Sequence, residues 1–224
     1  MQNCIQAVGP QGPSWYPSAV VGKLIRGFGA SACAAFVMFG AVSDAKAQNA
    51  EALFDQGLKA MLDGRYETGC PDIERSYGLD PQPGALFTLA ACYERWGKVH
   101  TATRHFEKFV SVARGLPAAE RAKQDKRIAT ANDKLSALRP QVPTLQLVFD
   151  TTPPDDVLVT VDGKSIPPAE IGQDRPIDPG QHRIEVRTGD GAVEEVSVQL
   201  AAGQSRTVTL PLPQGGGAGE SVSD

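Results

Sequence analysis

The residues that could carry chemistry in this chain are few and widely spaced. Its three histidines are His100, His105 and His182. A spacing of five places His100 and His105 on different faces of a helix, and His182 lies far along the chain, so no metal site is indicated. Asp155 and Asp156 are adjacent in a proline-rich turn and offer oxygen ligands for calcium, but a solvated turn is the favoured interpretation.

Compact catalytic motifs are also missing from the 224 residues. The chain has no Gly-x-Ser-x-Gly, no His-Glu-x-x-His, no phosphate-binding loop and no four-cysteine zinc pattern. Its formal net charge of −4, from 22 basic and 26 acidic residues, gives no electrostatic reason to bind nucleic acid. We therefore expect a protein that is not an enzyme, uses no cofactor or metal and does not bind nucleic acid.

Residues 1–47 are expected to be an export signal. Lys23 and Arg26 precede an apolar run of small residues at positions 28–42, which is too short for a comfortable membrane span. Ala45-Lys46-Ala47 then matches the small-x-small pattern that signal peptidase reads. This pattern predicts cleavage before Gln48.

Three alternatives remain for this segment. Residues 1–20 carry no charge and make an overlong front end, which favours a translation start near Val20 or Val21. An uncleaved signal would instead serve as a membrane anchor; without it, membrane contact is limited to surface association. Acylation of Cys33 is the third alternative, although no large aliphatic residue stands three positions before it.

One pattern occurs twice between residues 48 and 116. Ala52-Leu53-Phe54 is followed by Gly64, and Ala85-Leu86-Phe87 by Gly97, at an offset of 33 residues. A period in the low thirties is typical of stacked helical hairpins, which are binding surfaces more often than catalytic ones. Gly64 is expected to end the first helix in a left-handed conformation, and Asp80-Pro81 to end the second.

The residues that follow predict two more kinds of structure. Residues 117–139 are expected to form one capping helix, with an apolar stripe that includes Ile128 and Leu135. Residues 144–212 alternate apolar and polar side chains in at least five short runs, and turns at Asp162-Gly163 and Asp190-Gly191 are hairpin signals. The pattern predicts a small antiparallel β-sandwich, followed by a flexible glycine-rich tail at 213–224. The fold class is thus α+β in two domains.

Cys70 and Cys92 are the two cysteines that remain if the signal is removed. They fall in the second helix of the first unit and the first helix of the second unit, which are neighbours in a stacked array. An even pair in an exported chain is a disulfide candidate. Two buried free thiols are the alternative.

The helical units resemble tetratricopeptide repeats. The first unit departs from that family at Gly69, where alanine is usual, and neither unit begins with tryptophan. The resemblance implies a helical array that binds a protein or peptide through a groove. The residues that carry the likeness are Leu53, Gly57, Gly64, Tyr66, Gly69, Ile73, Ser76 and Pro81, then Leu86, Ala90, Gly97, Val99, Ala102, Phe106 and Phe109. The implied groove residues are Phe54, Leu58, Met61, Phe87, Ala91 and Arg95.

The β segment resembles PEGA-type domains of bacterial envelope proteins, on residues 159–163 and 178–186, although Pro-Glu-Gly-Ala itself is absent. The whole arrangement looks like envelope proteins of myxobacteria. This likeness implies a scaffolding or peptide-binding role in the periplasm or cell envelope of a Gram-negative bacterium.

Two functional hypotheses follow. In the first, the protein is an adaptor or scaffold that binds a protein or peptide partner through the helical groove, with the sandwich for envelope or subunit contacts. In the second, the sandwich binds envelope glycan or another surface, and the helices are structural. Glycan sites usually stack sugars on aromatic rings, and Phe149 is the sandwich's one aromatic residue, which favours the first hypothesis.

Overall fold

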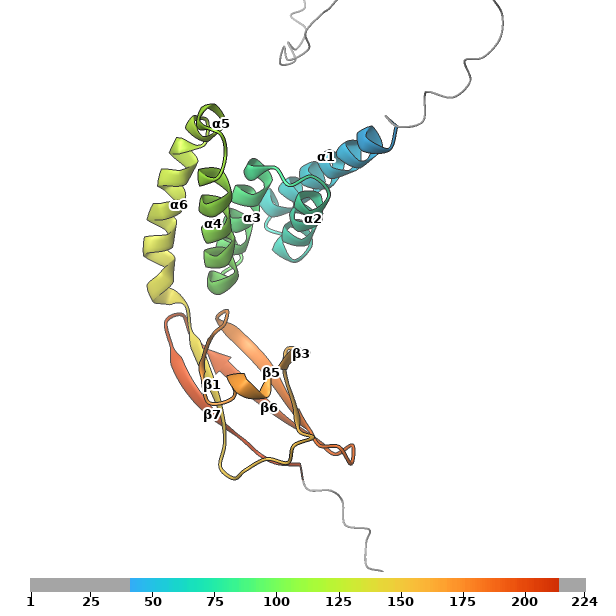
Figure 1. Cartoon of the computed structure of the whole chain (residues 1–224), viewed down its shortest axis with the longest axis vertical. Coiled ribbons are helices and arrows are strands. Elements are labelled where there is room, and N and C mark those ends of the chain that lie inside the picture. Colours follow the sequence, from blue (N-terminus) through green and yellow to red (C-terminus); the bar gives the residue numbers. More distant parts are fainter. Residues whose placement is uncertain (1–40, 214–224) are drawn as a thin grey trace, which may run out of the picture. The chain divides into compact units, whose positions relative to one another are not determined.

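The computed structural model describes residues 41–213, in which six α-helices precede seven β-strands (Figure 1). This part of the chain is therefore α+β. The helices are α1 (Ala41–Leu62), α2 (Tyr66–Leu79), α3 (Pro83–Arg95), α4 (Val99–Arg114), α5 (Ala118–Ala122) and α6 (Asp125–Leu138), with 3₁₀ helices η1 (Arg139–Gln141) and η2 (Pro168–Glu170). The strands are β1 (Thr144–Phe149), β2 (Leu158–Val161), β3 (Lys164–Ile166), β4 (Asp174–Pro176), β5 (Gly180–Arg187), β6 (Val193–Leu200) and β7 (Ser205–Leu210).

Several predictions for the N-terminal region fall on residues 1–40, which lie outside the described part. They concern most of the apolar run of the signal, the translation start and acylation of Cys33. Ala45-Lys46-Ala47, the predicted cleavage motif, belongs to the first turns of α1. Residues 214–224, most of the predicted tail, are likewise outside the described part. No helix among residues 41–213 is both long and apolar enough to span a membrane.

Helices α1 to α4 form two consecutive hairpins. The first helix of each hairpin, α1 or α3, ends with the same backbone geometry. Gly64 adopts a φ angle of 78°, as predicted for a left-handed cap, and Gly97 adopts the same conformation with a φ angle of 79°. At the first turn, the Arg65 N–H donates to the Ala60 carbonyl and the Gly64 N–H to the Met61 carbonyl. The same pair of hydrogen bonds recurs at Gly97, so the 33-residue repeat of the sequence is a repeat of backbone geometry.

The segment predicted as one helix over residues 117–139 is divided in the structure. The short α5 ends at Ala122, and α6 begins at Asp125. The physical reason is burial: α5 has no buried residue, whereas Ala131, Leu135 and Leu138 of α6 are buried in a core cluster that also contains residues of α3 and α4. The apolar stripe therefore stabilises only the second piece.

The β part consists of two sheets, of strand order β4-β1-β7 and β3-β2-β5-β6. The second is antiparallel throughout, and Asp162 and Gly163 form the predicted hairpin turn between β2 and β3, with φ angles of 49° and 75°. The first sheet is mixed, because β1 pairs parallel with β7. The prediction of an antiparallel sandwich was wrong here: β1 and β7 come from opposite ends of this region, so no hairpin dictates their direction.

Contacts between the α4 helix and the β part satisfy an otherwise uncapped helix end. The N-cap of α4, Lys98, makes no side-chain cap hydrogen bond. Instead the Thr101 N–H and Oγ1 donate to the two carboxylate oxygens of Asp178, over 2.9 and 2.6 Å. The carboxylate thus occupies a helix N-terminus, where negative charge is favourable.

Candidate functional site

A pocket of about 570 Å³ lies in the helical part, where the start of α3 meets α1 and the end of α2. All three helices contribute to it, so it depends on how the two hairpins stack. Its lining residues are Ala47, Gln48, Ala50, Glu51, Phe54, Ser76, Asp80, Gln82, Gly84 and Ala85. We call it the helical pocket.

Local sequence chemistry shapes the helical pocket. The Ser76 Oγ is buried and donates to the Ala50 carbonyl over 2.7 Å, which ties the end of α2 to α1. Pro81 follows the last turn of α2 and cannot continue it, while Pro83 is the first residue of α3. Between them the Gln82 Nε2 donates to the Asp80 Oδ1 over 2.9 Å. These prolines and this hydrogen bond hold the α2–α3 connection in place as one wall of the helical pocket.

The lining of the helical pocket combines an apolar surface with negative charge. Phe54 is half-buried, and Ala50 and Ala85 are buried. Glu51 is exposed and Asp80 half-buried, and the lining contains no lysine or arginine. Opposite charges attract most strongly where water is partly excluded. Chemically, the pocket can hold an apolar side chain that has a basic group beside it.

The six groove residues predicted from the repeat resemblance are not gathered in this pocket. Phe54 alone lines it. Phe54 and Leu58 pack against the core cluster around Ile73 and the two cysteines. Met61 belongs to that cluster and is only 5% exposed, so its side chain is committed to the core.

The three groove residues predicted on α3 take other positions. The Phe87 ring makes edge contacts with the rings of Phe106 and Phe109, with centroids 5.7 and 5.2 Å apart. Ala91 packs on the core cluster that contains Phe106 and Phe109, and Arg95 is exposed in the last turn of α3. Because its ring packs against α4, Phe87 does not line the helical pocket.

The polar lining residues were missed by sequence reasoning. Glu51, Asp80 and Gln82 lie outside the repeat positions that carry the family likeness, so nothing marked them as a group. One signal was present: Asp80-Pro81 and Pro83 bracket a short connection between helices, and such connections bring polar backbone and side chains to the surface.

Cys70 and Cys92 form a disulfide that joins α2 to α3. Both residues are completely buried, in a cluster with Met61, Ile73 and Leu89. The bond closes a loop between residues 22 positions apart and holds together the two helices whose connection forms a wall of the helical pocket. It is thus placed to keep the pocket's shape.

Two of the three histidines, His182 and His105, make contacts with neighbouring side chains or backbone. Nδ1 of the buried His182 lies 2.7 Å from Asp162 Oδ2, and its Nε2 lies 2.7 Å from the Asp178 carbonyl oxygen. The His105 ring stacks on Tyr93, with centroids 5.2 Å apart, and burial lowers the pKa of His105. Burial also lowers the pKa of His100. Within residues 41–213, no group of three or more His, Cys, Asp or Glu side chains is arranged to hold a metal ion.

No protein-family model matches the chain, and no curated protein is significantly similar to it.

Proposed function

We propose that the protein is an exported, non-catalytic adaptor that holds a peptide segment of a partner protein in the helical pocket. The observation that carries the proposal is the lining itself: an apolar surface at Phe54 beside the carboxylates of Glu51 and Asp80, with no lining cation. This lining suits a segment in which an apolar side chain adjoins lysine or arginine. The one lining hydroxyl, on Ser76, is engaged by the Ala50 carbonyl, which supports binding over catalysis.

The proposal extends to the architecture. Residues 48–116 would form two tetratricopeptide-type units, residues 117–139 their closing segment, and residues 144–212 a separate PEGA-like domain. The repeated glycine turns of α1 and α3 support the first part. The proposal of a separate PEGA-like domain is supported by a hydrophobic core cluster of its own. The residues of this cluster all come from β1, β2, β3, β5, β6 and β7 and from neighbouring loops.

Export to the periplasm or cell envelope of a Gram-negative bacterium is part of the same proposal. The Cys70–Cys92 disulfide supports it, because disulfides persist in oxidising compartments and are rare in the cytosol. Fractionation of the native cells, with N-terminal sequencing of the recovered protein, tests this part. Recovery from the cytosol with reduced cysteines would contradict it.

The binding proposal is tested by selecting peptides from a random display library against the folded protein. The selected peptides should share an apolar residue beside lysine or arginine. Chemical shifts of the protein amides, recorded with one selected peptide, should change around Phe54, Glu51 and Asp80. Selection of acidic peptides, or shift changes confined to the β part, would refute the proposal.

A further inference from the structure

The β part has a second, larger pocket of about 780 Å³, at a place where the sheet β4-β1-β7 is incomplete. Strand β4 pairs with β1 only at Thr144, Leu145 and Gln146. One residue further, the Gly172 N–H donates to the Leu147 carbonyl over 2.7 Å, and Gly172, at a φ of 82°, turns its chain away from β1. The rest of β1 is left with a neighbour on the β7 side alone.

The direction of the backbone groups on β1 can be worked out from the parallel ladder. The Thr144 N–H donates toward β7, to the Gln204 carbonyl. Because the direction alternates along a strand, the N–H and C=O of Val148 also face β7, and those of Leu147 and Phe149 face the other way. The bond from Gly172 to the Leu147 carbonyl agrees with this alternation.

The N–H and C=O of Phe149 therefore point into the open side of the sheet. No other residue among 41–213 supplies a backbone or side-chain partner for them. An unpaired strand edge is a template for a further strand. We call this feature the β1 edge: the backbone N–H and C=O of Phe149 beside the pocket.

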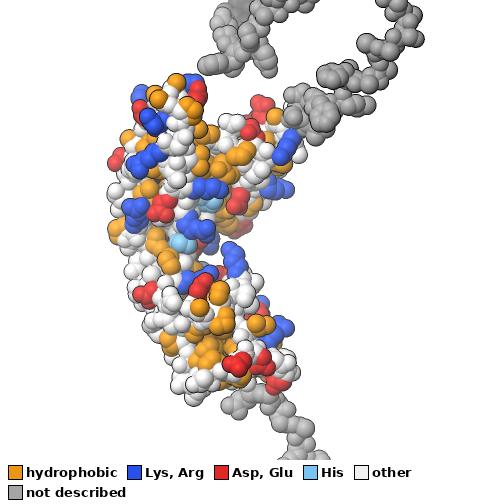
Figure 2. All heavy atoms as spheres, viewed as in Figure 1, with side chains coloured by type: hydrophobic (Ala, Val, Ile, Leu, Met, Phe, Trp, Pro, Cys, Tyr) orange, Lys and Arg blue, Asp and Glu red, His pale blue; other side chains and the backbone are white. Residues whose placement is uncertain are grey.

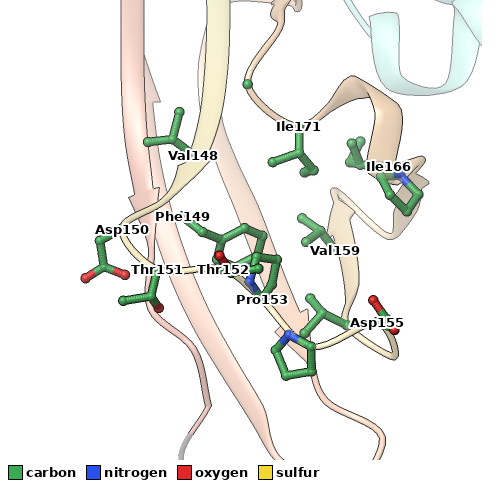
Figure 3. A pocket seen from close by; sticks show the side chains of 14 residues that line it. Val148, Phe149, Asp150, Thr151, Thr152, Pro153, Asp155, Val159, Ile166 and Ile171 are labelled. Atoms are coloured by element: carbon green, nitrogen blue, oxygen red, sulfur yellow. The ribbon is translucent and has the colours of Figure 1, made fainter.

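The pocket beside the β1 edge reaches into the sandwich core. Figure 3 shows Phe149 from β1 on one side of the pocket, with Ile171, Ile166 and Val159 opposite. Val159 and Ile166 are each only 4% exposed, and Phe149 and Ile171 pack against the same core cluster. In a strand added at this edge, alternate side chains would point between these residues. The space suits a branched apolar side chain.

The rim of the same pocket is acidic. Asp150 and Asp155 line it and are exposed, and no lysine or arginine does. On the face shown in Figure 2, hydrophobic side chains gather over the β part with acidic side chains beside them. An occupant is therefore favoured if the residues on either side of its apolar side chain are basic.

We propose that the β1 edge binds an extended segment of a partner protein, in which valine-like residues alternate with lysine or arginine, as an added strand. Main-chain hydrogen bonds to Phe149 would supply affinity, and the apolar pocket and acidic rim would supply specificity. The proposal rests on the β part alone and does not depend on the helical pocket.

The probe is the blocked peptide acetyl-Val-Lys-Val-Lys-Val-amide, with a second version methylated on the backbone nitrogens that would pair and a third with glutamate in place of lysine. The first peptide should bind and should slow hydrogen exchange at the Phe149 amide. Methylation should weaken binding by about tenfold, as expected for a lost hydrogen bond. Replacement by glutamate should weaken it further.

Asp155→Asn and Asp156→Asn form a matched pair, since only Asp155 lines the pocket and both are exposed. The first should weaken binding several-fold and the second should not. Equal binding of the methylated peptide, no protection at Phe149, or failure of the first peptide to bind would overturn the proposal. Binding of an aliphatic fatty acid in the pocket without displacement of the bound peptide would also overturn the proposal. So would dimerisation of the protein through the β1 edge.

Discussion

Gly69 of α2 lies directly against the backbone of Gly57 in α1. A Cβ atom on Gly69 would stand 2.8 Å from the Gly57 carbonyl oxygen, and a Cβ on Gly57 would stand 2.8 Å from the Gly69 carbonyl oxygen. Side-chain carbon atoms do not approach backbone oxygen so closely. The two glycines therefore permit the close packing of α1 on α2, and this explains the glycine at position 69, where the resembled repeat family usually has alanine.

Gly69→Ala is expected to lower the free energy of unfolding by about 1–2 kcal/mol. Alanine improves helix propensity by roughly 1 kcal/mol, but overpacking against backbone atoms costs about 1–3 kcal/mol, and rigid backbone cannot yield as a side chain can. Gly78→Ala, in the same helix with open space around it, is the matched control and should be neutral or stabilising. Urea unfolding measures both. Equal effects at the two positions would contradict this account of the α1–α2 contact.

The Cys70–Cys92 disulfide is expected to contribute about 3 kcal/mol to stability, because it restricts a loop between residues 22 positions apart in the unfolded chain. Urea unfolding of the protein with and without a reductant measures this difference. A Cys70→Ala/Cys92→Ala variant is the control, and its unfolding should not respond to the reductant. If reduction leaves the wild-type unfolding curve unchanged, the bond has no stabilising role.

Asp162 should make stability depend on pH in the acid range. Burial alone would raise the pKa of Asp162, but hydrogen bonds from His182 and the Arg183 N–H, with the nearby positive charges of His182 and Lys98, hold it below its ordinary value of 3.8. A lowered pKa means that the ionised carboxylate stabilises the fold above about pH 4. That stabilisation is lost as the pH falls through the folded-state pKa.

Asp162→Asn tests this prediction without disturbing the turn, because asparagine tolerates the φ of 49° at this position. The variant should be less stable at pH 7 by roughly 0.5–1 kcal/mol, as is usual for a partly exposed pair, and the deficit should shrink toward pH 2. Unfolding curves across this pH range, with Asp156→Asn for comparison, provide the measurement. A deficit that stays constant with pH would rule out the charged carboxylate as its source.

Local chemistry explains which features could be predicted from the sequence. The left-handed turns at Gly64 and Gly97, the end of α2 before Pro81 and the Asp162-Gly163 hairpin each depend on a few adjacent residues. The pairing of strands that lie far apart in the sequence could not be read in this way. The parallel pairing of β1 with β7 joins the two ends of the β part, and no local signal sets its direction.

The two candidate binding sites show the same difference between local and long-range features. Phe54, one of the six residues of the predicted groove, lines the helical pocket. Phe87 occupies the equivalent place in the second unit, but its partly buried ring packs against the rings of Phe106 and Phe109 on α4. The β1 edge was also beyond sequence reasoning, because it exists only where Gly172 turns a separate strand away from β1.

Binding of a peptide in the helical pocket is the central claim, and isothermal titration with variants of Phe54 and Leu62 tests it most directly. The titrant is a display-selected peptide. Leu62 is also on α1, is 67% exposed and lies outside the pocket, so Leu62→Ala is the matched control. Phe54→Ala should weaken binding by about thirtyfold, the equivalent of roughly 2 kcal/mol for a lost aromatic contact, and Leu62→Ala should not change it.

Glu51→Gln, at an exposed position, should weaken binding of a lysine-containing peptide without loss of folding. Unchanged affinity in both Phe54→Ala and Glu51→Gln would contradict the claim.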